Sequence, residues 1–140
     1  MDPIDEQSAM LKKDGAAFRK VDCNCWNHQK RIQECDSTSV DVQVLSIIPV
    51  LFSYWAKDNE GLTLSKFLNN HIAEVVRDEP NRFIGLGTVP LQNPNMSINE
   101  MDRVVNELKL PGIEIGSNVN GENLSEEKFH PIFEHAEKIG

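Results

Sequence analysis

Four cationic side chains lie close together near the start of the chain, and these residue types in this pattern suit the binding of an anion. The chain is acidic, with a formal net charge of -8, yet four of its 14 lysines and arginines fall within nine residues: Lys12, Lys13, Arg19 and Lys20. The planar guanidinium of Arg19 can hold a carboxylate through two parallel hydrogen bonds, and Lys13 would add a second positive charge. The alternative interpretation is a solvated, charged surface hairpin.

The residues between these cations predict the element that positions them. Residues 10–11 and 18–21 form two short arms, and Asp14-Gly15 between them favours a tight turn with positive φ. This pattern indicates a β-hairpin. The polar and acidic residues 1–9 are expected to be frayed or loosely attached.

The chain's four histidines and three cysteines show no spacing typical of a metal site. His130 and His135 are five residues apart, unlike the histidines of the H-E-x-x-H motif, and His71 with Glu74 is interpreted as part of a solvated helix face. The cysteines match neither a zinc pattern nor a disulfide framework, so we expect reduced thiols. They are Cys23, Cys25 and Cys35.

The composition excludes several classes of protein. A chain of 140 residues with 39% hydrophobic and 26% charged residues has the size and composition of one globular domain. Its negative net charge argues against nucleic-acid binding, which requires a basic face. No apolar run is long enough to cross a membrane, and the first ten residues lack the features of a signal peptide. We therefore expect a cytosolic protein with no nucleic-acid or membrane partner.

The most unusual stretch is the apolar run between residues 39 and 56. Its β-branched residues are too continuous for a strand with one wet face, so we expect a central strand of a parallel sheet, covered on both sides and ended by Pro49. The segment beyond, residues 50–55, stays apolar and aromatic. It is interpreted as the wall of a ligand site, as part of a subunit contact, or as a loop packed under its own helix.

The patterns along the rest of the chain predict alternating helices and strands. Ser97 and Glu100 have the spacing of a capping box at the start of a helix, and the two glycines of RFIGLGTVP leave room for a neighbouring backbone or a substrate. A dinucleotide-binding loop is disfavoured, because the third glycine is missing. The expected helices lie near residues 27–36, 62–79, 98–108 and 125–139, and the expected strands at 40–48, 82–90 and 113–115, with an irregular polar loop at 116–123.

Several motifs are shared with one enzyme family. The run VQVLSIIPVLFSYWAK, the segments LNN, RFIGLGTVPLQ and PGIEIG, and upstream KDG, FR and NCW resemble the 2-amino-3-carboxymuconate-6-semialdehyde decarboxylases. That family belongs to the amidohydrolase superfamily of metal-dependent (β/α)8 barrels. The similarity extends from about residue 11 to residue 140.

The resemblance implies a cytosolic decarboxylase of tryptophan and kynurenine breakdown that diverts material from NAD synthesis. It implies a homodimer, a single zinc ion that activates a water, and a small dicarboxylate semialdehyde as substrate. In the family an arginine that follows a phenylalanine binds the substrate carboxylate, which assigns substrate-binding roles to Arg19, Phe18 and Lys13 here.

The same resemblance implies what this sequence does not carry. The family's zinc ligands and its acid/base histidine have no counterpart here. The four histidines of this chain, at positions 28, 71, 130 and 135, match none of them, so we expect no metal and no catalytic residue in this chain. A closed barrel takes about 250 residues. We therefore expect a fragment that is inactive and poorly stable alone: a partial (β/α)8 barrel of about three β/α units (residues 23–140) with a hairpin insertion (residues 8–22). The alternatives are a non-catalytic module that pairs with a full-length paralogue, and another hydrolase or decarboxylase of the superfamily.

Overall fold

The computed structural model of the chain describes residues 2–13 and 15–140, including only the backbone of Lys13. It consists of two compact units, residues 1–43 and residues 44–140. We call them the N-terminal unit and the C-terminal unit. None of the helices in the described residues combines the length and the apolar character that a membrane crossing requires.

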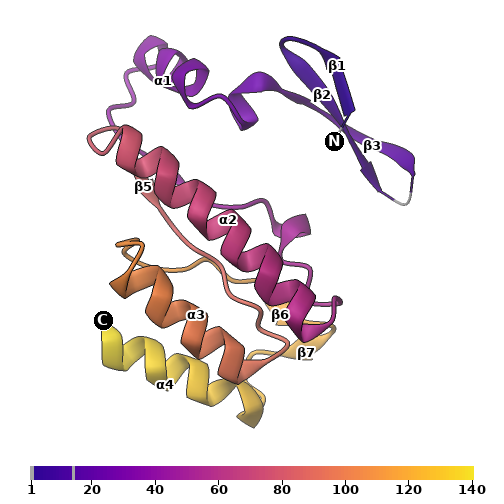
Figure 1. Cartoon of the computed structure of the whole chain (residues 1–140), viewed down its shortest axis with the longest axis vertical. Helices are drawn as coiled ribbons and strands as arrows, with labels where there is room; N and C mark the ends of the chain where they lie inside the picture. The colour runs from indigo at the N-terminus through magenta and orange to yellow at the C-terminus, as the bar shows by residue number, and fades with distance from the viewer. Residues whose placement is uncertain (1, 14) are drawn as a thin grey trace. The chain divides into compact units, whose positions relative to one another are not determined.

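The N-terminal unit contains a three-stranded antiparallel sheet in the order β1-β2-β3 (Figure 1). The strands are β1 (Asp2–Asp5), β2 (Ser8–Lys13) and β3 (Ala16–Asp22). Strands β2 and β3 form the predicted hairpin, whose turn has Gly15 at φ +79°, while Asp14 lies outside the described residues. The expectation that residues 1–9 are loosely attached is wrong, because β1 pairs with β2 and the Asp5 carboxylate accepts hydrogen bonds from Gln7 N and Ser8 Oγ in the turn between them.

A short helical segment completes this unit. The 3-10 turn η1 (Cys23–Cys25) leads to helix α1 (His28–Ser37). Asn27 caps α1, since its side chain accepts a hydrogen bond from Lys30 N at 3.1 Å. All three cysteines are free thiols.

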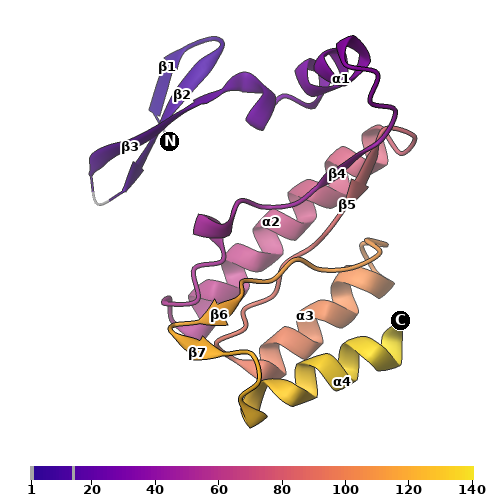
Figure 2. The same cartoon turned by 180° about the vertical axis from the view of Figure 1, so that it is seen from behind.

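The C-terminal unit alternates strands and helices. Figures 1 and 2 show helices α2, α3 and α4 side by side, with α3 between the other two. Strand β4 begins at the last residue of the N-terminal unit. The elements in chain order are β4 (Gln43–Leu45), η2 (Pro49–Leu51), α2 (Asp58–Asp78), β5 (Phe83–Gly85), α3 (Pro94–Asn106), β6 (Asn118–Val119), β7 (Glu122–Asn123), η3 (Glu127–Phe129) and α4 (His130–Ile139).

The strands occupy the predicted positions but are shorter than predicted. Strand β5 pairs with β4, and Leu86 N donates to Leu45 O at 2.8 Å. The third predicted strand is a single parallel bridge between Gly87 and Ile113. This arrangement of β/α units is part of a (β/α)8 barrel, as expected.

The prediction that the 40–48 strand is covered on both sides is wrong for the described residues. Ile47 is buried in the core, but Val44 is 56% exposed and Ile48 is 48% exposed. Ile84 of β5 is exposed as well. The helices cover one face of these strands only, so the alternate side chains remain uncovered.

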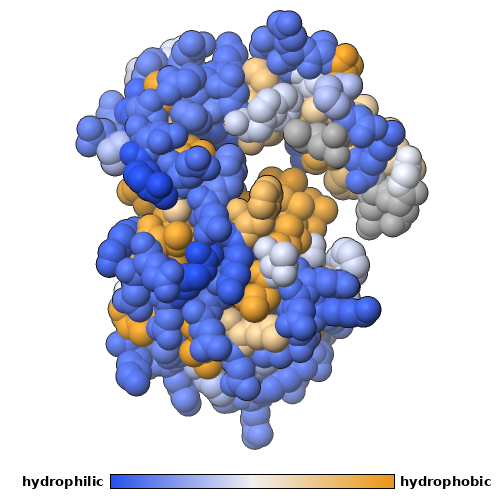
Figure 3. All heavy atoms as spheres, viewed as in Figure 1, coloured by the Kyte–Doolittle hydropathy of each residue, from blue (hydrophilic) through white to orange (hydrophobic). Residues whose placement is uncertain are grey.

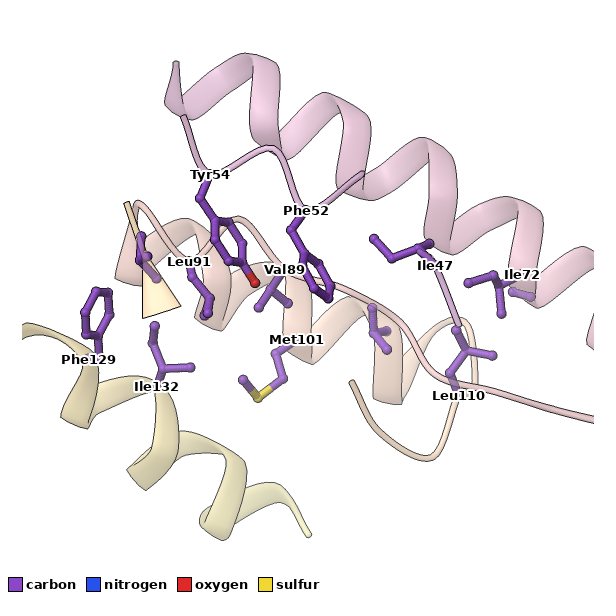
Figure 4. Packing of buried hydrophobic residues seen from close by; sticks show 13 residues of the cluster. Ile47, Phe52, Tyr54, Ile72, Val89, Leu91, Met101, Leu110, Phe129 and Ile132 are labelled. Atoms are coloured by element: carbon purple, nitrogen blue, oxygen red, sulfur yellow. The ribbon is translucent and has the colours of Figure 1, made fainter. Parts of the chain in front are cut away.

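The core of this unit lies between the strands and the three helices (Figure 4). Gly85 and Gly87 face that core: a Cβ on Gly85 would lie 2.5 Å from Ile72 of α2, and a Cβ on Gly87 would lie 2.8 Å from Val104 of α3. The glycines therefore allow close packing of the helices, and the space we had assigned to a backbone or a substrate is filled by helix side chains.

The chain after residue 116 is more regular than predicted. Strands β6 and β7 form a hairpin whose turn residues, Asn120 and Gly121, both have positive φ, at 53° and 89°. An Asn-Gly pair between short strands is a strong hairpin signal that our interpretation as an irregular loop overlooked. The last helix begins with the separate turn η3 before Pro131, as predicted.

Candidate functional site

The hairpin places Arg19 on a strand with an irregular register. Leu11 pairs with Arg19 and Lys12 pairs with Ala17, so Phe18 has no partner and forms a β-bulge. A bulge bends its strand and changes the direction of the neighbouring side chains, and bulges are enriched beside active sites. No feature of the sequence had indicated this bulge.

The guanidinium of Arg19 is exposed, and among the described residues it has no hydrogen-bond or ion-pair partner. Lys12 differs, since its Nζ lies 2.5 Å from the Asp2 carboxylate and thereby lowers the pKa of Asp2. Phe18 is 55% exposed. Lys13 belongs to β2, but its side chain lies outside the described part of the chain. Within the described part of the hairpin, the guanidinium of Arg19 thus has no partner, and Arg19 follows the exposed aromatic residue Phe18.

The described residues do not fit the metal ion that the sequence resemblance implies. Nowhere in residues 2–13 and 15–140 do three histidine, cysteine or acidic side chains gather in a way that could hold a metal, and a catalytic zinc takes three protein ligands. Two of the histidines have other roles: His135 Nε2 lies 2.8 Å from Asp102 Oδ1 between α4 and α3, and His130 contacts the Ser125 carbonyl.

The aromatic segment after β4 is divided between buried and exposed residues. Phe52 and Tyr54 are buried and stacked, with ring centroids 5.5 Å apart, and Figure 4 shows both rings beside Val89. Val50 and Trp55 are exposed, Trp55 by 80%, and Figure 3 shows apolar surface where Figure 1 draws η2. The segment is therefore packed onto its own unit in part, while Val50 and Trp55 remain available for a ligand or a subunit.

Tyr54 connects this segment to residues 116–120 through two hydrogen bonds. Its hydroxyl accepts a hydrogen bond from Gly116 N at 3.0 Å, and its carbonyl accepts one from Asn120 Nδ2 at 2.9 Å. Burial raises the pKa of Tyr54, and the nearby charge of Glu114 raises it further, against the lowering effect of the Gly116 N–H. Tyr54 thus remains a neutral phenol at physiological pH.

A buried polar cluster links α2, the segment that follows β5, and α3. The Asn69 side chain accepts from Thr88 N at 2.7 Å and donates to both Thr88 O and Glu100 Oε1 at 2.8 Å. Arg103 binds both oxygens of Glu100, at 2.7 and 2.9 Å, and this contact raises the pKa of Arg103. The Asn69 side chain therefore forms the two hydrogen bonds with the Thr88 backbone that a neighbouring strand would otherwise form.

This cluster corrects the predicted capping box. The cap of α3 is Asn93, which accepts from Met96 N. Ser97 is buried inside the helix, where its hydroxyl donates to Pro90 O at 2.8 Å, and Glu100 is buried with Arg103. The S-x-x-E spacing arises here because both residues occupy the inner face of α3.

Comparisons with known proteins agree with this architecture. The chain is 53% identical over 132 residues to a 2-amino-3-carboxymuconate-6-semialdehyde decarboxylase of Dictyostelium discoideum, covering 94% of this chain and 37% of that protein. An enzyme of the same name from Caenorhabditis elegans is 28% identical over 159 aligned positions, covering 99% of this chain and 39% of that protein. The chain thus spans less than half the length of these relatives.

Solved structures show the same fold. The crystal structure of a 5-carboxyvanillate decarboxylase from Novosphingobium aromaticivorans, with bound manganese, matches with a TM-score of 0.75 and 34% identity over 79% of this chain and 32% of that one. The resemblance to the decarboxylases of this superfamily is confirmed. Residues 23–140 match the amidohydrolase family model, and the chain therefore belongs to the amidohydrolase family.

Proposed function

We propose that this chain is part of a metal-dependent, non-oxidative decarboxylase that acts on 2-amino-3-carboxymuconate 6-semialdehyde in tryptophan and kynurenine breakdown. The observation that carries the proposal is the 53% identity to the Dictyostelium decarboxylase over 94% of this chain. A match of that length includes the hairpin as well as the β/α units. We assign residues 8–22 to a hairpin insertion and residues 23–140 to the barrel.

The hairpin is proposed to bind the substrate. Arg19 binds a substrate carboxylate through its two parallel N–H groups, Lys13 adds a second positive charge, and Phe18 packs against the unsaturated carbon chain. The exposure of Arg19, which has no partner among residues 2–13 and 15–140, and the bulge at Phe18 support this assignment.

Other properties are proposed for the complete enzyme only. They are a zinc ion, a homodimeric state, a cytosolic location and a place in the control of NAD synthesis. No described residue is assigned to the metal, and we expect this chain alone to release no carbon dioxide.

A segment exchange tests the proposal. In the Dictyostelium decarboxylase, this chain replaces the segment that it matches, and release of carbon dioxide from the semialdehyde is measured. We expect decarboxylation by the exchange protein, and a loss of about 30-fold in kcat/KM for Arg19→Ala, because a charge-assisted pair contributes about 2 kcal/mol. The matched control is Arg77→Ala, an exposed arginine in the last turn of α2, which should leave kcat/KM unchanged.

Two results would contradict the proposal. The first is a folded exchange protein that does not decarboxylate the semialdehyde. The second, which concerns only the carboxylate-binding role, is an Arg19→Ala variant within about twofold of its parent.

A second candidate is a decarboxylase of an aromatic acid. The 34% identity to the 5-carboxyvanillate decarboxylase favours it. To decide between the two, kcat/KM of the same exchange protein is measured with 5-carboxyvanillate and with the muconate semialdehyde. The acid with the higher kcat/KM identifies the favoured candidate.

A further inference from the structure

Thr88 and Glu114 occupy facing positions on two neighbouring strand segments. Gly87 N donates to Gly112 O at 2.9 Å, and Gly87 O accepts from Glu114 N at 2.8 Å. These two bonds bridge Gly87 to Ile113 in parallel, so the next residue on each segment, Thr88 and Glu114, lies in register with the other.

Both side chains belong to the face of the strands that points away from the helices. A Cβ on Gly87 would meet Val104 of α3, so position 87 faces the helices and Thr88 faces the opposite side. Glu114, in register with Thr88, shares that side. In a (β/α)8 barrel the face away from the helices is the barrel interior, and sites form at the carboxyl ends of the strands.

Each of the two side chains has a buried oxygen without a partner. Thr88 is 1% exposed, and neither its Oγ1 nor Glu114 Oε2 has a hydrogen-bond partner among the described residues. The backbone of Thr88, in contrast, is fully paired with Asn69. Unpaired buried oxygens are costly and rare, and a group that binds to them in the complete site is one explanation for their presence.

Tyr54 lies close to the segment that carries Glu114. Its hydroxyl is bound to Gly116 N, two residues beyond Glu114, and the charge of Glu114 acts on the phenol.

We propose that the Thr88 hydroxyl and the Glu114 carboxylate bind a hydrogen-bond-donating group of the substrate on the interior face of the barrel. A carboxylate only accepts hydrogen bonds, so it selects an N–H or O–H group. The inference rests on the proposed function, for which the donor is the amino group of the muconate semialdehyde.

Two substitutions in the exchange protein test this inference. Thr88→Val keeps the shape of the side chain and replaces the hydroxyl by a methyl group. Glu114→Gln replaces one carboxylate oxygen by an NH2 group, which donates hydrogen bonds and does not accept them. We expect each to lower kcat/KM by about tenfold or more and to leave the unfolding temperature unchanged, because the lost oxygen has no partner in the folded chain. With a substrate analogue that lacks the amino group, the Glu114→Gln variant should differ from its parent by less than about twofold.

Two control substitutions likewise remove a hydroxyl or a carboxylate, but at positions where the side-chain oxygen has a partner in the structure. Ser97→Ala removes a buried hydroxyl that donates to Pro90 O, and Glu100→Gln alters a buried carboxylate that binds Arg103. Each should lower the unfolding temperature by about 4 °C or more.

Three outcomes would overturn the inference. An active exchange protein in which both Thr88→Val and Glu114→Gln retain kcat/KM within about twofold contradicts this inference alone. The second outcome is an unfolding temperature that falls as much for Thr88→Val as for Ser97→Ala, in the exchange protein and in the 140-residue chain. Such a fall would show that the Thr88 hydroxyl has a structural partner. A folded exchange protein inactive toward both acids contradicts the proposed function, and this inference with it.

Discussion

Replacement of Asn69 by alanine should destabilise the C-terminal unit far more than the same change at the next residue. Asn69 is fully buried and makes three hydrogen bonds, two of them to the backbone of Thr88. Asn69→Ala would leave the N–H and C=O of Thr88 buried and unpaired, and each such group costs about 1–3 kcal/mol. We therefore expect the free energy of unfolding to fall by about 4 kcal/mol.

The matched control is Asn70→Ala. Asn70 is exposed, and its Oδ1 accepts one hydrogen bond from Arg103 at 2.8 Å. Removal of this bond should cost about 0.5 kcal/mol, because water replaces the lost partner. The two variants differ by one position on the same helix, so the helix propensity of alanine affects both alike.

Urea unfolding of the chain, followed by circular dichroism, measures both changes. The slope m should stay constant, which shows that the midpoint shift reports stability. Hydrogen exchange at the Thr88 amide gives a local measurement, since this amide should lose its protection in Asn69→Ala and keep it in Asn70→Ala. Equal costs for the two variants, or a cost below about 1 kcal/mol for Asn69→Ala, would refute the assigned role of Asn69.

Three further predictions concern other contacts. His135→Ala removes the contact with Asp102 between α4 and α3 and should lower stability by about 1 kcal/mol in urea unfolding; an unchanged midpoint would contradict it. Gly87→Ala places a Cβ 2.8 Å from a core valine of α3 and should cost about 1–3 kcal/mol, whereas the control Gly112→Ala, with its nearest contact at 3.6 Å, should cost less than about 1 kcal/mol. Contact with Lys12 lowers the pKa of Asp2 from 3.8, so the contribution of this pair to the β1–β2 pairing is present above pH 3.8 and should be lost as the pH falls below that value. NMR should show the amide signals of β1 changing in that range; unchanged signals would contradict the prediction.

Helices α2, α3 and α4 were predictable from this sequence because each carries one apolar face, whereas α1 was indicated by its capping asparagine. The three- and four-residue spacings around Ile72 and Val104 correspond to α2 and α3, and Pro80 follows the end of α2. These signals are local, and they survive in any larger context.

The strands and the polar cluster were less predictable because they depend on distant residues. Val44 and Ile48 are as apolar as a two-sided strand requires, but no described residue covers their second face. Asn69, Glu100 and Arg103 look like surface residues in the sequence, and only the packing of α2 on α3 brings them together. The resemblance of Arg19 to a carboxylate-binding arginine came from family motifs, since charge counting left a solvated hairpin open.

The hairpin that carries Arg19 is part of a three-stranded sheet in which β2 pairs with both β1 and β3. The hydrogen bonds between its strands and its Lys12–Asp2 pair are made within residues 2–22, and Cys23 of η1 adds a backbone hydrogen bond to Gln7 O at 2.8 Å. Under the proposed function, exchange of this sheet for another, by evolution or by a protein engineer, is a direct way to alter which acid is bound.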